Sequence, residues 1–276
     1  IFMPDHLGGQ LAPVPALVTA AEACDLRIGV FVFGNDFRHP VVLAKEAATL
    51  DLLSEGRLEL GIGAGWLRSD YEGSGIPFDP PGRRVDRLEE AVAILKGLFA
   101  EGPFSFEGTH YTVTNLDGRP KPLQRPHPPL LIGGGGRRIL DLAAREADIV
   151  GINPNLKAGE ISPLEQGIDS TAAATRRKVE WVRRAAGERF DDLELNVLIF
   201  FAIVTNQRRE QAEMIGAAGG MGADQVLGTP HLLVGTVDQI CEDLEQRREA
   251  FGISYPVLNE ASFEVVAPVV DRLTGT

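Results

Sequence analysis

Residues 129–152 read PLLIGGGGRRILDLAAREADIVGI, and this stretch decides the fold class. An aliphatic run at Pro129–Ile132 is followed by glycines, an amphipathic segment at Arg137–Glu146 and a second aliphatic run at Asp148–Ile152. Aliphatic runs without polar alternation are typical of strands that are buried on both faces. A strand, a helix and a strand in succession indicate a parallel α/β architecture.

The same alternation extends through the rest of the chain. The strands that it predicts are Ile1–Met3, Arg27–Phe33, Arg57–Ile62, Pro129–Ile132, Asp148–Ile152, Glu194–Val204 and Ile253–Leu258. The predicted helices are Val14–Cys24, Val41–Ser54, Val85–Ala100, Arg137–Glu146, Ala172–Ala186, Arg208–Ala217, Val237–Ala250 and Phe263–Leu273. This regular spacing without a linker predicts a single domain over residues 1–276.

Two longer connections interrupt the pattern, around residues 102–128 and 153–170. In the first, apolar and polar residues alternate on both sides of Glu107-Gly108, which predicts a small β-hairpin. The second is polar and contains Gly and Pro. Seven strands are visible, whereas a closed barrel needs eight and an open doubly wound sheet needs fewer, so both architectures remain possible at this point.

Composition limits the function classes. The chain has 27 basic and 39 acidic side chains and a formal net charge of −12, which argues against a general nucleic-acid binder. Its longest apolar runs, such as residues 195–204, reach only half of the roughly 20 residues that a bilayer span needs. The two cysteines, Cys24 and Cys241, lie far apart, and no histidine spacing fits a metal site. We expect a cytoplasmic protein without a metal.

Four glycines, Gly133 to Gly136, join a predicted strand to a predicted helix. Glycine lets backbone amides approach an anion closely, and the helix N-terminus at Arg137 adds free N–H groups, so this loop favours a phosphate. A flexible turn without a ligand is the alternative. The loop matches neither a P-loop nor a GxGxxG fingerprint.

The stretch Leu60–Trp66 carries alternate glycines at a strand end. Missing side chains would let a flat ring lie against the backbone, with Trp66 stacked on it. Equally, small residues could relieve crowding there, with Trp66 in the core.

Asp5-His6 follows the first predicted strand, and histidine exchanges protons near neutral pH. An adjacent carboxylate can fix the imidazole tautomer, although an ordinary solvated loop is the alternative. In a second polar loop, we expect Asp36 and Arg38 to pair with each other. The charge-rich segment Arg83–Glu90 predicts a solvated helix face.

With these pieces in order, the chain resembles the bacterial-luciferase-like monooxygenase family, and more closely its deazaflavin branch, which uses coenzyme F-420. The matching segments are Pro4–Leu7, Phe33–Pro40, Leu50–Trp66, Arg83–Glu90, Pro126–Pro129, Ile132–Arg138 and Ala147-Asp148. The resemblance implies a (β/α)8 TIM barrel. It also implies that a first βα unit is missing ahead of Ile1, and it implies a homodimer.

Carried over by residue, the resemblance implies that His6 and Asp5 take part in proton transfer. It implies that the cofactor contacts Phe31, Val32, Gly63, Gly134, Gly135, Gly136 and Arg137, with a cis peptide bond between Phe31 and Val32. Family members that act on sugar phosphates carry a glutamate where this chain has Trp66. The resemblance therefore leaves the substrate open.

We therefore expect an oxidoreductase that transfers a hydride between coenzyme F-420, or alternatively FMN, and a small organic molecule. An FMN-dependent luciferase-like monooxygenase and a non-catalytic cofactor-binding or partner protein are the competing hypotheses. A phosphate-binding isomerase or lyase is disfavoured because it needs a lysine or paired carboxylates at a strand end. The lysines Lys45, Lys96 and Lys178 instead lie in predicted helices.

Overall fold

The computed structural model describes residues 1–156, 159–160 and 162–274, with the side chains of Pro163 and Glu165 left aside. The chain divides into two compact units, which are described separately. The first comprises residues 1–133, 146–148 and 157–160, and the second residues 134–145, 149–156 and 161–276. The prediction of one domain over residues 1–276 stays a prediction. The predicted insertion at 153–170 lies partly outside the described residues.

The first unit is built on a parallel sheet. Its strands are β1 (Phe2–Met3), β2 (Ile28–Val30), β4 (Leu58–Gly63) and β7 (Leu130–Gly134), in that order, while the short β3 (Phe33–Gly34) also pairs with β4. The register places Gly29 beside Phe2 and Leu60 beside Leu130. All six residues of β4 are buried, as expected for a strand that is covered on both faces. The predicted strand Arg27–Phe33 is thus two short strands.

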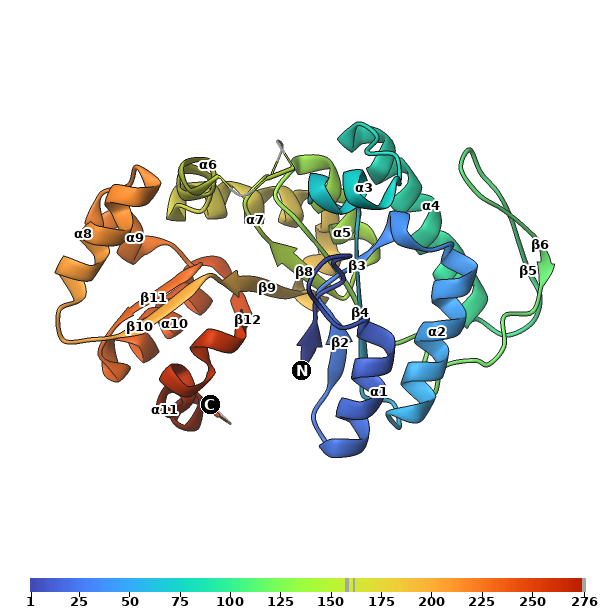
Figure 1. Ribbon diagram of the computed structural model, residues 1–276, viewed down its shortest axis with the longest axis horizontal. Helices are drawn as coiled ribbons and strands as arrows, with labels where there is room; N and C mark the ends of the chain where they lie inside the picture. The colour runs from blue at the N-terminus through green and yellow to red at the C-terminus, as the bar shows by residue number, and fades with distance from the viewer. Residues whose placement is uncertain (157–158, 161, 275–276) are drawn as a thin grey trace. The chain divides into compact units, whose positions relative to one another are not determined.

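Helices cover this sheet, and α1, α2 and α4 lie side by side (Figure 1). The bounds are α1 Pro13–Ala23, α2 Pro40–Leu53, α3 Arg68–Ser74 and α4 Pro81–Phe99, with a 3-10 turn at Asn35–Phe37. Proline opens α1, α2 and α4, where a missing N–H costs nothing. Arg57 joins two helix ends, because its guanidinium donates to Cys24 O at 2.7 Å and to Ser54 O at 2.8 Å.

The predicted hairpin is confirmed. Strands β5 (Phe104–Glu107) and β6 (Thr112–Leu116) pair in antiparallel fashion. The first strand packs against α4 at Gly97, where an added Cβ would lie 2.2 Å from the Phe104 ring. Gly97 therefore allows the hairpin to approach this helix.

The second unit contains two parallel groups of strands. In one, β9 (Glu194–Ile199) lies between β8 (Ile149–Ile152) and β12 (Ile253–Leu258). In the other, β10 (Phe201–Val204) pairs with β11 (Leu232–Gly235). The helices are α5 Arg137–Glu146, α6 Pro163–Asp169, α7 Ala172–Ala186, α8 Arg208–Gly219, α9 Ala223–Gly228, α10 Val237–Phe251 and α11 Phe263–Leu273, with 3-10 turns at Gly187–Asp192 and Glu260–Ser262.

One strand prediction is wrong in this unit. The predicted strand Glu194–Val204 is broken at Phe200, where the chain changes partners. The Phe200 N–H donates to His231 O at 2.8 Å, and Asn259 Nδ2 donates to Phe200 O at 2.8 Å. The apolar run is continuous in sequence, but its two halves belong to different strand pairs.

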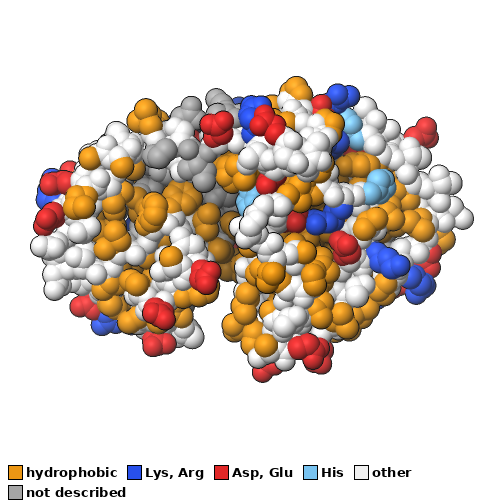
Figure 2. Space-filling view, viewed as in Figure 1, with side chains coloured by type: hydrophobic (Ala, Val, Ile, Leu, Met, Phe, Trp, Pro, Cys, Tyr) orange, Lys and Arg blue, Asp and Glu red, His pale blue; other side chains and the backbone are white. Residues whose placement is uncertain are grey.

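The parallel α/β class is confirmed by both units. On the face shown in Figure 2, basic side chains are scattered among acidic ones. Within the described ranges, no helix combines the length and the apolar character that crossing a membrane would require.

Candidate active site

His6 lies directly after β1, and its ring is held by a carboxylate from a distant part of the chain. Its Nδ1 lies 2.6 Å from Oδ2 of Asp70, on α3. The other oxygen of Asp70 accepts the Leu7 N–H at 3.1 Å. The Asp70 side chain is 7% exposed and that of His6 is 26% exposed. A partly accessible imidazole beside a buried carboxylate is an arrangement suited to proton transfer.

Trp66 adds an apolar wall to this histidine. Its ring meets the His6 ring edge-on, with centroids 5.7 Å apart and an interplanar angle of 86°. The side chain is partly buried, so it is neither a fully enclosed core residue nor a free one. Trp66 therefore belongs to the surroundings of His6.

Asp5 does not hold the imidazole, and the expectation that this adjacent carboxylate fixes it is wrong. Its Oδ2 accepts from Arg38 at 2.7 Å and from the Gly34 N–H at 2.9 Å, while Oδ1 accepts from Arg38 at 3.2 Å. The two neighbouring side chains thus have different partners, Arg38 for Asp5 and Asp70 for His6. Asp5 instead ties the end of β1 to the loop after β3.

The predicted pairing of Asp36 with Arg38 is also wrong. Asp36 receives two hydrogen bonds from Arg87, both at 2.9 Å, and a third from the Tyr71 hydroxyl at 3.0 Å. Arg87 lies in the segment predicted as a solvated helix face, yet its side chain is only 18% exposed. The sequence could not indicate this, because the partners of Arg87 come from other elements.

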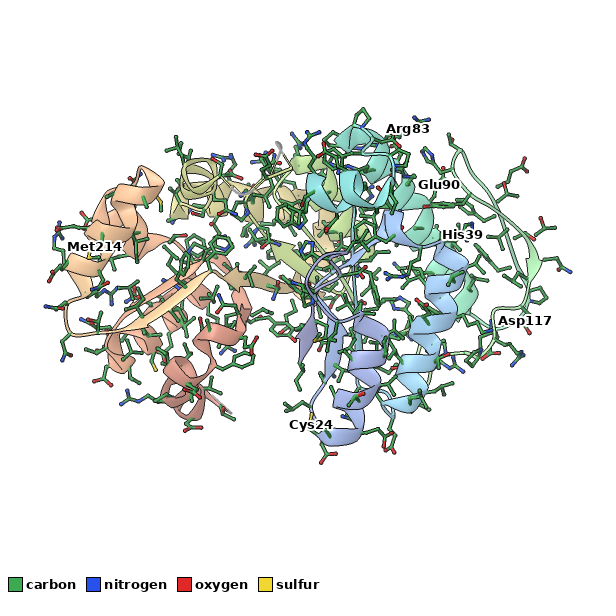
Figure 3. The ribbon with its side chains drawn as sticks, in the orientation of Figure 1. Cys24, His39, Arg83, Glu90, Asp117 and Met214 are labelled. Atoms are coloured by element: carbon green, nitrogen blue, oxygen red, sulfur yellow. The ribbon has the colours of Figure 1, made fainter. Side chains whose placement is uncertain are left out.

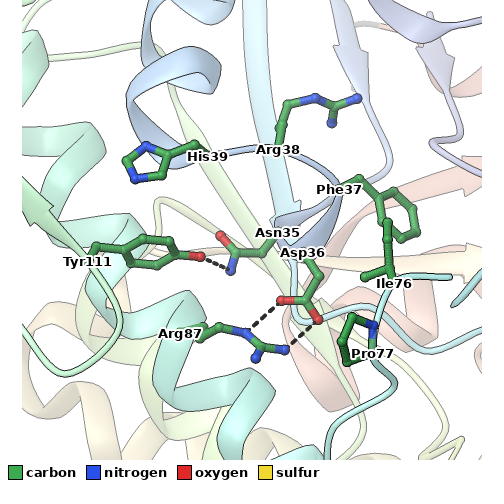
Figure 4. Close-up of a pocket in the computed structure, with 9 residues that line it drawn as sticks. All are labelled: Asn35, Asp36, Phe37, Arg38, His39, Ile76, Pro77, Arg87 and Tyr111. Atoms are coloured by element: carbon green, nitrogen blue, oxygen red, sulfur yellow. Dashed lines mark hydrogen bonds and ion pairs between the residues drawn. The ribbon is translucent and has the colours of Figure 1, made fainter. Parts of the chain in front are cut away.

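Asp36 and Arg87 border a pocket of about 320 Å³ (Figure 4). It is lined by Asn35, Asp36, Phe37, Arg38, His39, Ile76, Pro77, Arg87 and Tyr111. Asn35 donates to the Tyr111 hydroxyl at 3.2 Å. Burial, together with the charge of Asp36, raises the pKa of Tyr71 well above its ordinary value, so this phenol stays protonated. The charged groups around this pocket serve to fix the loop that follows β3.

Three of the predicted cofactor residues lie in this first unit. The peptide bond between Phe31 and Val32 is cis, as the resemblance implied. A Cβ added to Gly63 would lie 2.7 Å from Cγ2 of Val32, so these two positions are in contact. Packing explains the neighbouring glycines as well, because a Cβ at Gly61 would lie 2.0 Å from Val30 O and one at Gly65 would lie 1.8 Å from the Tyr71 hydroxyl.

The glycine loop opens the second unit. A Cβ on Gly134 would lie 2.4 Å from Ile139, and one on Gly135 would lie 2.3 Å from the backbone of Asn155. At Gly136, by contrast, the nearest atom of the described residues is Asn155 Nδ2 at 3.6 Å. Of these three glycines, Gly136 is the one without a close packing contact among the described residues. It immediately precedes α5, where the Arg137 side chain is 67% exposed.

Lys178 lies in α7 as predicted, and its ammonium group is fully engaged. Its Nζ lies 2.8 Å from Asn153 O, 2.7 Å from Asp169 O and 2.7 Å from Asp169 Oδ2. Burial lowers the pKa of this lysine despite the carboxylate. With three donors on three acceptors, Lys178 fixes its surrounding loop rather than offering a nucleophile. Among the described residues, no group of acidic, histidine or cysteine side chains could hold a metal ion.

The chain belongs to the luciferase-like monooxygenase family, whose model matches residues 1–254. It is 35% identical over 141 residues to the FMNH(2)-dependent dimethylsulfone monooxygenase of Pseudomonas putida, which covers 51% of this chain and 39% of that protein. It is 32% identical over 194 residues to the F420-dependent glucose-6-phosphate dehydrogenase of Microbacterium testaceum. That alignment covers 65% of this chain and 56% of the relative. The chain thus spans about two fifths of the first relative and little more than half of the second.

The fold has solved counterparts. The structure of the coenzyme F420-dependent tetrahydromethanopterin reductase of Methanopyrus kandleri matches with a TM-score of 0.77 at 18% identity, covering 99% of this chain and 90% of that one. The expected luciferase-like TIM-barrel class is therefore confirmed. Relatives include both FMN- and F420-dependent enzymes, and an oxidoreductase class is common to them.

Proposed function

We propose that the protein is an oxidoreductase that transfers a hydride between a deazaflavin or flavin cofactor and a small organic substrate. Membership of the family supports this class. The observation that carries it is the His6–Asp70 pair at the end of β1, with Nδ1 and Oδ2 only 2.6 Å apart. In this proposal His6 holds or releases the proton that accompanies hydride transfer. Asp5 anchors the adjoining loop and has no direct chemical part.

The residues present fit such a cofactor. In the second unit, Gly136 is open to close approach and precedes the N–H groups that begin α5, which suits a phosphate. Gly134 and Gly135 shape that loop, and Arg137 supplies a positive charge. In the first unit, Phe31, Val32 and Gly63 offer an apolar surface for a ring. When bound, the cofactor supplies the hydride chemistry, and the protein supplies position and proton transfer.

Coenzyme F-420 is the cofactor that we propose first. The alignment with the F420-dependent relative covers 65% of the chain, against 51% for the FMNH(2)-dependent relative. The FMNH(2)-dependent relative shows the higher identity, 35% against 32%, which favours FMN and a monooxygenase reaction as the second candidate. We also propose a homodimer, which light scattering would test, and a cytoplasmic location, in keeping with two free cysteines.

The test combines a substrate screen with a matched pair of variants. Purified protein is mixed with each cofactor and with panels of alcohols, carbonyl compounds and sulfur compounds, and the cofactor absorbance is followed. On the substrate found, we expect His6→Asn to lower kcat by about 10²- to 10⁴-fold, the usual share of a positioned acid or base. His110→Asn, at the hairpin, serves as the control and should leave kcat unchanged. Equal turnover in wild type and His6→Asn would remove the proposed role.

A further inference from the structure

Asp70 binds the end of β1 through both of its oxygens. Oδ2 lies 2.6 Å from His6 Nδ1, and Oδ1 accepts the N–H of the next residue, Leu7, at 3.1 Å. One carboxylate therefore holds both the ring and the backbone beside it. The Leu7 bond fixes the carboxylate beside the ring, and rotation of the imidazole would break its own hydrogen bond to Oδ2.

The carboxylate also selects which ring nitrogen carries the proton. An ionised carboxylate can only accept, so Nδ1 must be the N–H donor in this pair. In the neutral imidazole, Nε2 is then the nitrogen with the free lone pair. Among the described residues, no hydrogen bond to Nε2 is found, and the His6 side chain is 26% exposed. Nε2 is thus the atom available to a substrate.

The short helix that carries Asp70 is itself anchored. Tyr71, the next residue, is fully buried, and its hydroxyl donates to Asp36 Oδ2 at 3.0 Å. Arg87 holds the same carboxylate through two hydrogen bonds of 2.9 Å. A seven-residue helix is too short to keep its own position without such contacts. This anchor gives Asp70 a fixed place opposite His6.

We propose that Asp70 is a positioning residue that holds the neutral His6 in the Nδ1–H tautomer and so presents Nε2 as the proton-transfer atom. The competing view is that Asp70 only binds the Leu7 backbone. In that case the tautomer of His6 would not depend on the charge of Asp70. The proposal rests on the proposed role of His6 for its catalytic consequence. The tautomer itself is a property of the protein without cofactor or substrate.

The first test therefore measures the tautomer directly. Protein labelled with ¹⁵N-histidine is observed in long-range ¹H–¹⁵N spectra with the imidazole in its neutral form, and the His6 signals are assigned through His6→Asn. We expect the wild type to show protonated Nδ1 and bare Nε2. Asp70→Asn should shift His6 toward the Nε2–H form, because the amide can present a donor to Nδ1. Glu72→Gln, an exposed charge loss on the same helix, is the control and should change nothing.

A wild-type His6 in the Nε2–H form would overturn the proposal, whether or not Asp70→Asn folds. So would an unchanged tautomer in a folded Asp70→Asn protein. Neither result would bear on cofactor binding, so the proposed function would still stand or fall on its own test.

The second test is kinetic. On the substrate identified by the screen, Asp70→Asn should lower kcat about a hundredfold or more with little change in KM, as expected for a group that acts only on proton transfer. Asp70→Glu should recover part of that loss, since it restores the carboxylate. A loss confined to KM, or equal activity in Asp70→Asn and Glu72→Gln, would contradict a positioning role.

Discussion

The glycines of the loop before α5 do different things, although their sequence is uniform. Gly135 lies against the backbone of residues 153–155, with distances of 2.3 Å from its Cβ position to Asn155 N and to Pro154 C. Gly136 has no such neighbour within 3.4 Å among the described residues. One glycine is thus required by packing, and the other is available to a ligand.

These two positions should respond differently to alanine. Gly135→Ala should lower the free energy of unfolding by about 1–3 kcal/mol, the usual cost of overpacking, because backbone must move. Gly136→Ala should leave stability within about 0.5 kcal/mol but weaken cofactor binding about tenfold, since a methyl group would keep a phosphate from the amides. Denaturant unfolding and fluorescence titration measure the two effects. Equal cofactor affinity in Gly136→Ala and wild type would contradict the proposal that this loop binds the cofactor phosphate.

The candidate site could be predicted from sequence only in part. His6 could be predicted because the Asp5-His6 dipeptide directly follows a predicted strand, and the residues after each strand are the candidates for a site in a parallel sheet. Its partner Asp70 is 64 residues away, in a helix of seven residues. The sequence neighbour Asp5 was the simpler choice and proved to bind Arg38. A polar residue soon after the β4 glycines was the available signal, since strand ends of a parallel sheet converge.

At the scale of elements, the hairpin of β5 and β6 is held by one carboxylate. Glu90 lies on α4 (Figure 3). Its carboxylate accepts the N–H groups of Thr109, His110 and Tyr111 at 2.7, 2.9 and 3.0 Å. Tyr111 in turn contacts Asn35 and meets the His39 ring at 5.2 Å. The hairpin tip is therefore bound to α4 through Glu90 and to the loop after β3 through Tyr111.

Removing this charge should loosen the hairpin tip alone. Hydrogen bonds to a charged acceptor contribute about 1.5–3 kcal/mol, against about 0.5–1.5 kcal/mol for neutral ones. In Glu90→Gln we expect the amides of residues 109–111 to exchange with deuterium about tenfold faster. Glu107→Gln, an exposed charge loss in the same hairpin, is the control. If both variants exchange alike, the three bonds to Glu90 do not hold the tip.

Long periodic elements were predictable, and short ones were not. The predicted helices Arg137–Glu146, Ala172–Ala186 and Phe263–Leu273 have the observed bounds. Helices α3, α6 and α9 have six or seven residues, too few for a period of 3.6 to show. Strand β11 has four residues, and its partner in the described part of the chain is β10, which is half of a run predicted as one strand. The break at Phe200 depends on hydrogen bonds to His231 and Asn259, which are far away in sequence and therefore leave no local pattern.

At the scale of the molecule, one buried histidine connects stability to pH. His231 is fully buried, its Nδ1 lies 2.9 Å from Leu198 O, and its ring stacks on Phe200 at 5.0 Å. Burial lowers the pKa of His231 to about 4, from an ordinary 6.5. The unfolded chain therefore binds a proton between these two values that the folded chain does not bind.

This difference predicts a loss of stability in mild acid. Because the unfolded state binds more protons, the free energy of unfolding should fall as pH drops from 6.5 to about 4. A difference of this size corresponds to a loss on the order of 3 kcal/mol. Urea unfolding at pH 7 and pH 5 measures the part of this loss that falls between those two values, about 2 kcal/mol. The variant His231→Asn, which keeps a donor for Leu198 O, should show a smaller decrease. If the free energy of unfolding decreases equally with pH in wild type and in His231→Asn, other groups cause the effect.

The net charge of −12 sets a condition for any anionic cofactor, which must be held by local amides and arginines against the field of the whole chain. Binding should therefore be saturable and weakened in Gly136→Ala.

The most direct measurement of the central claim is a fluorescence titration of the purified protein with coenzyme F-420 and with FMN in each redox state. We expect saturable binding of one of these cofactors, with coenzyme F-420 bound more tightly than FMN. Tighter binding of FMN would replace the deazaflavin assignment with the monooxygenase alternative. Absence of binding by both would contradict the central claim.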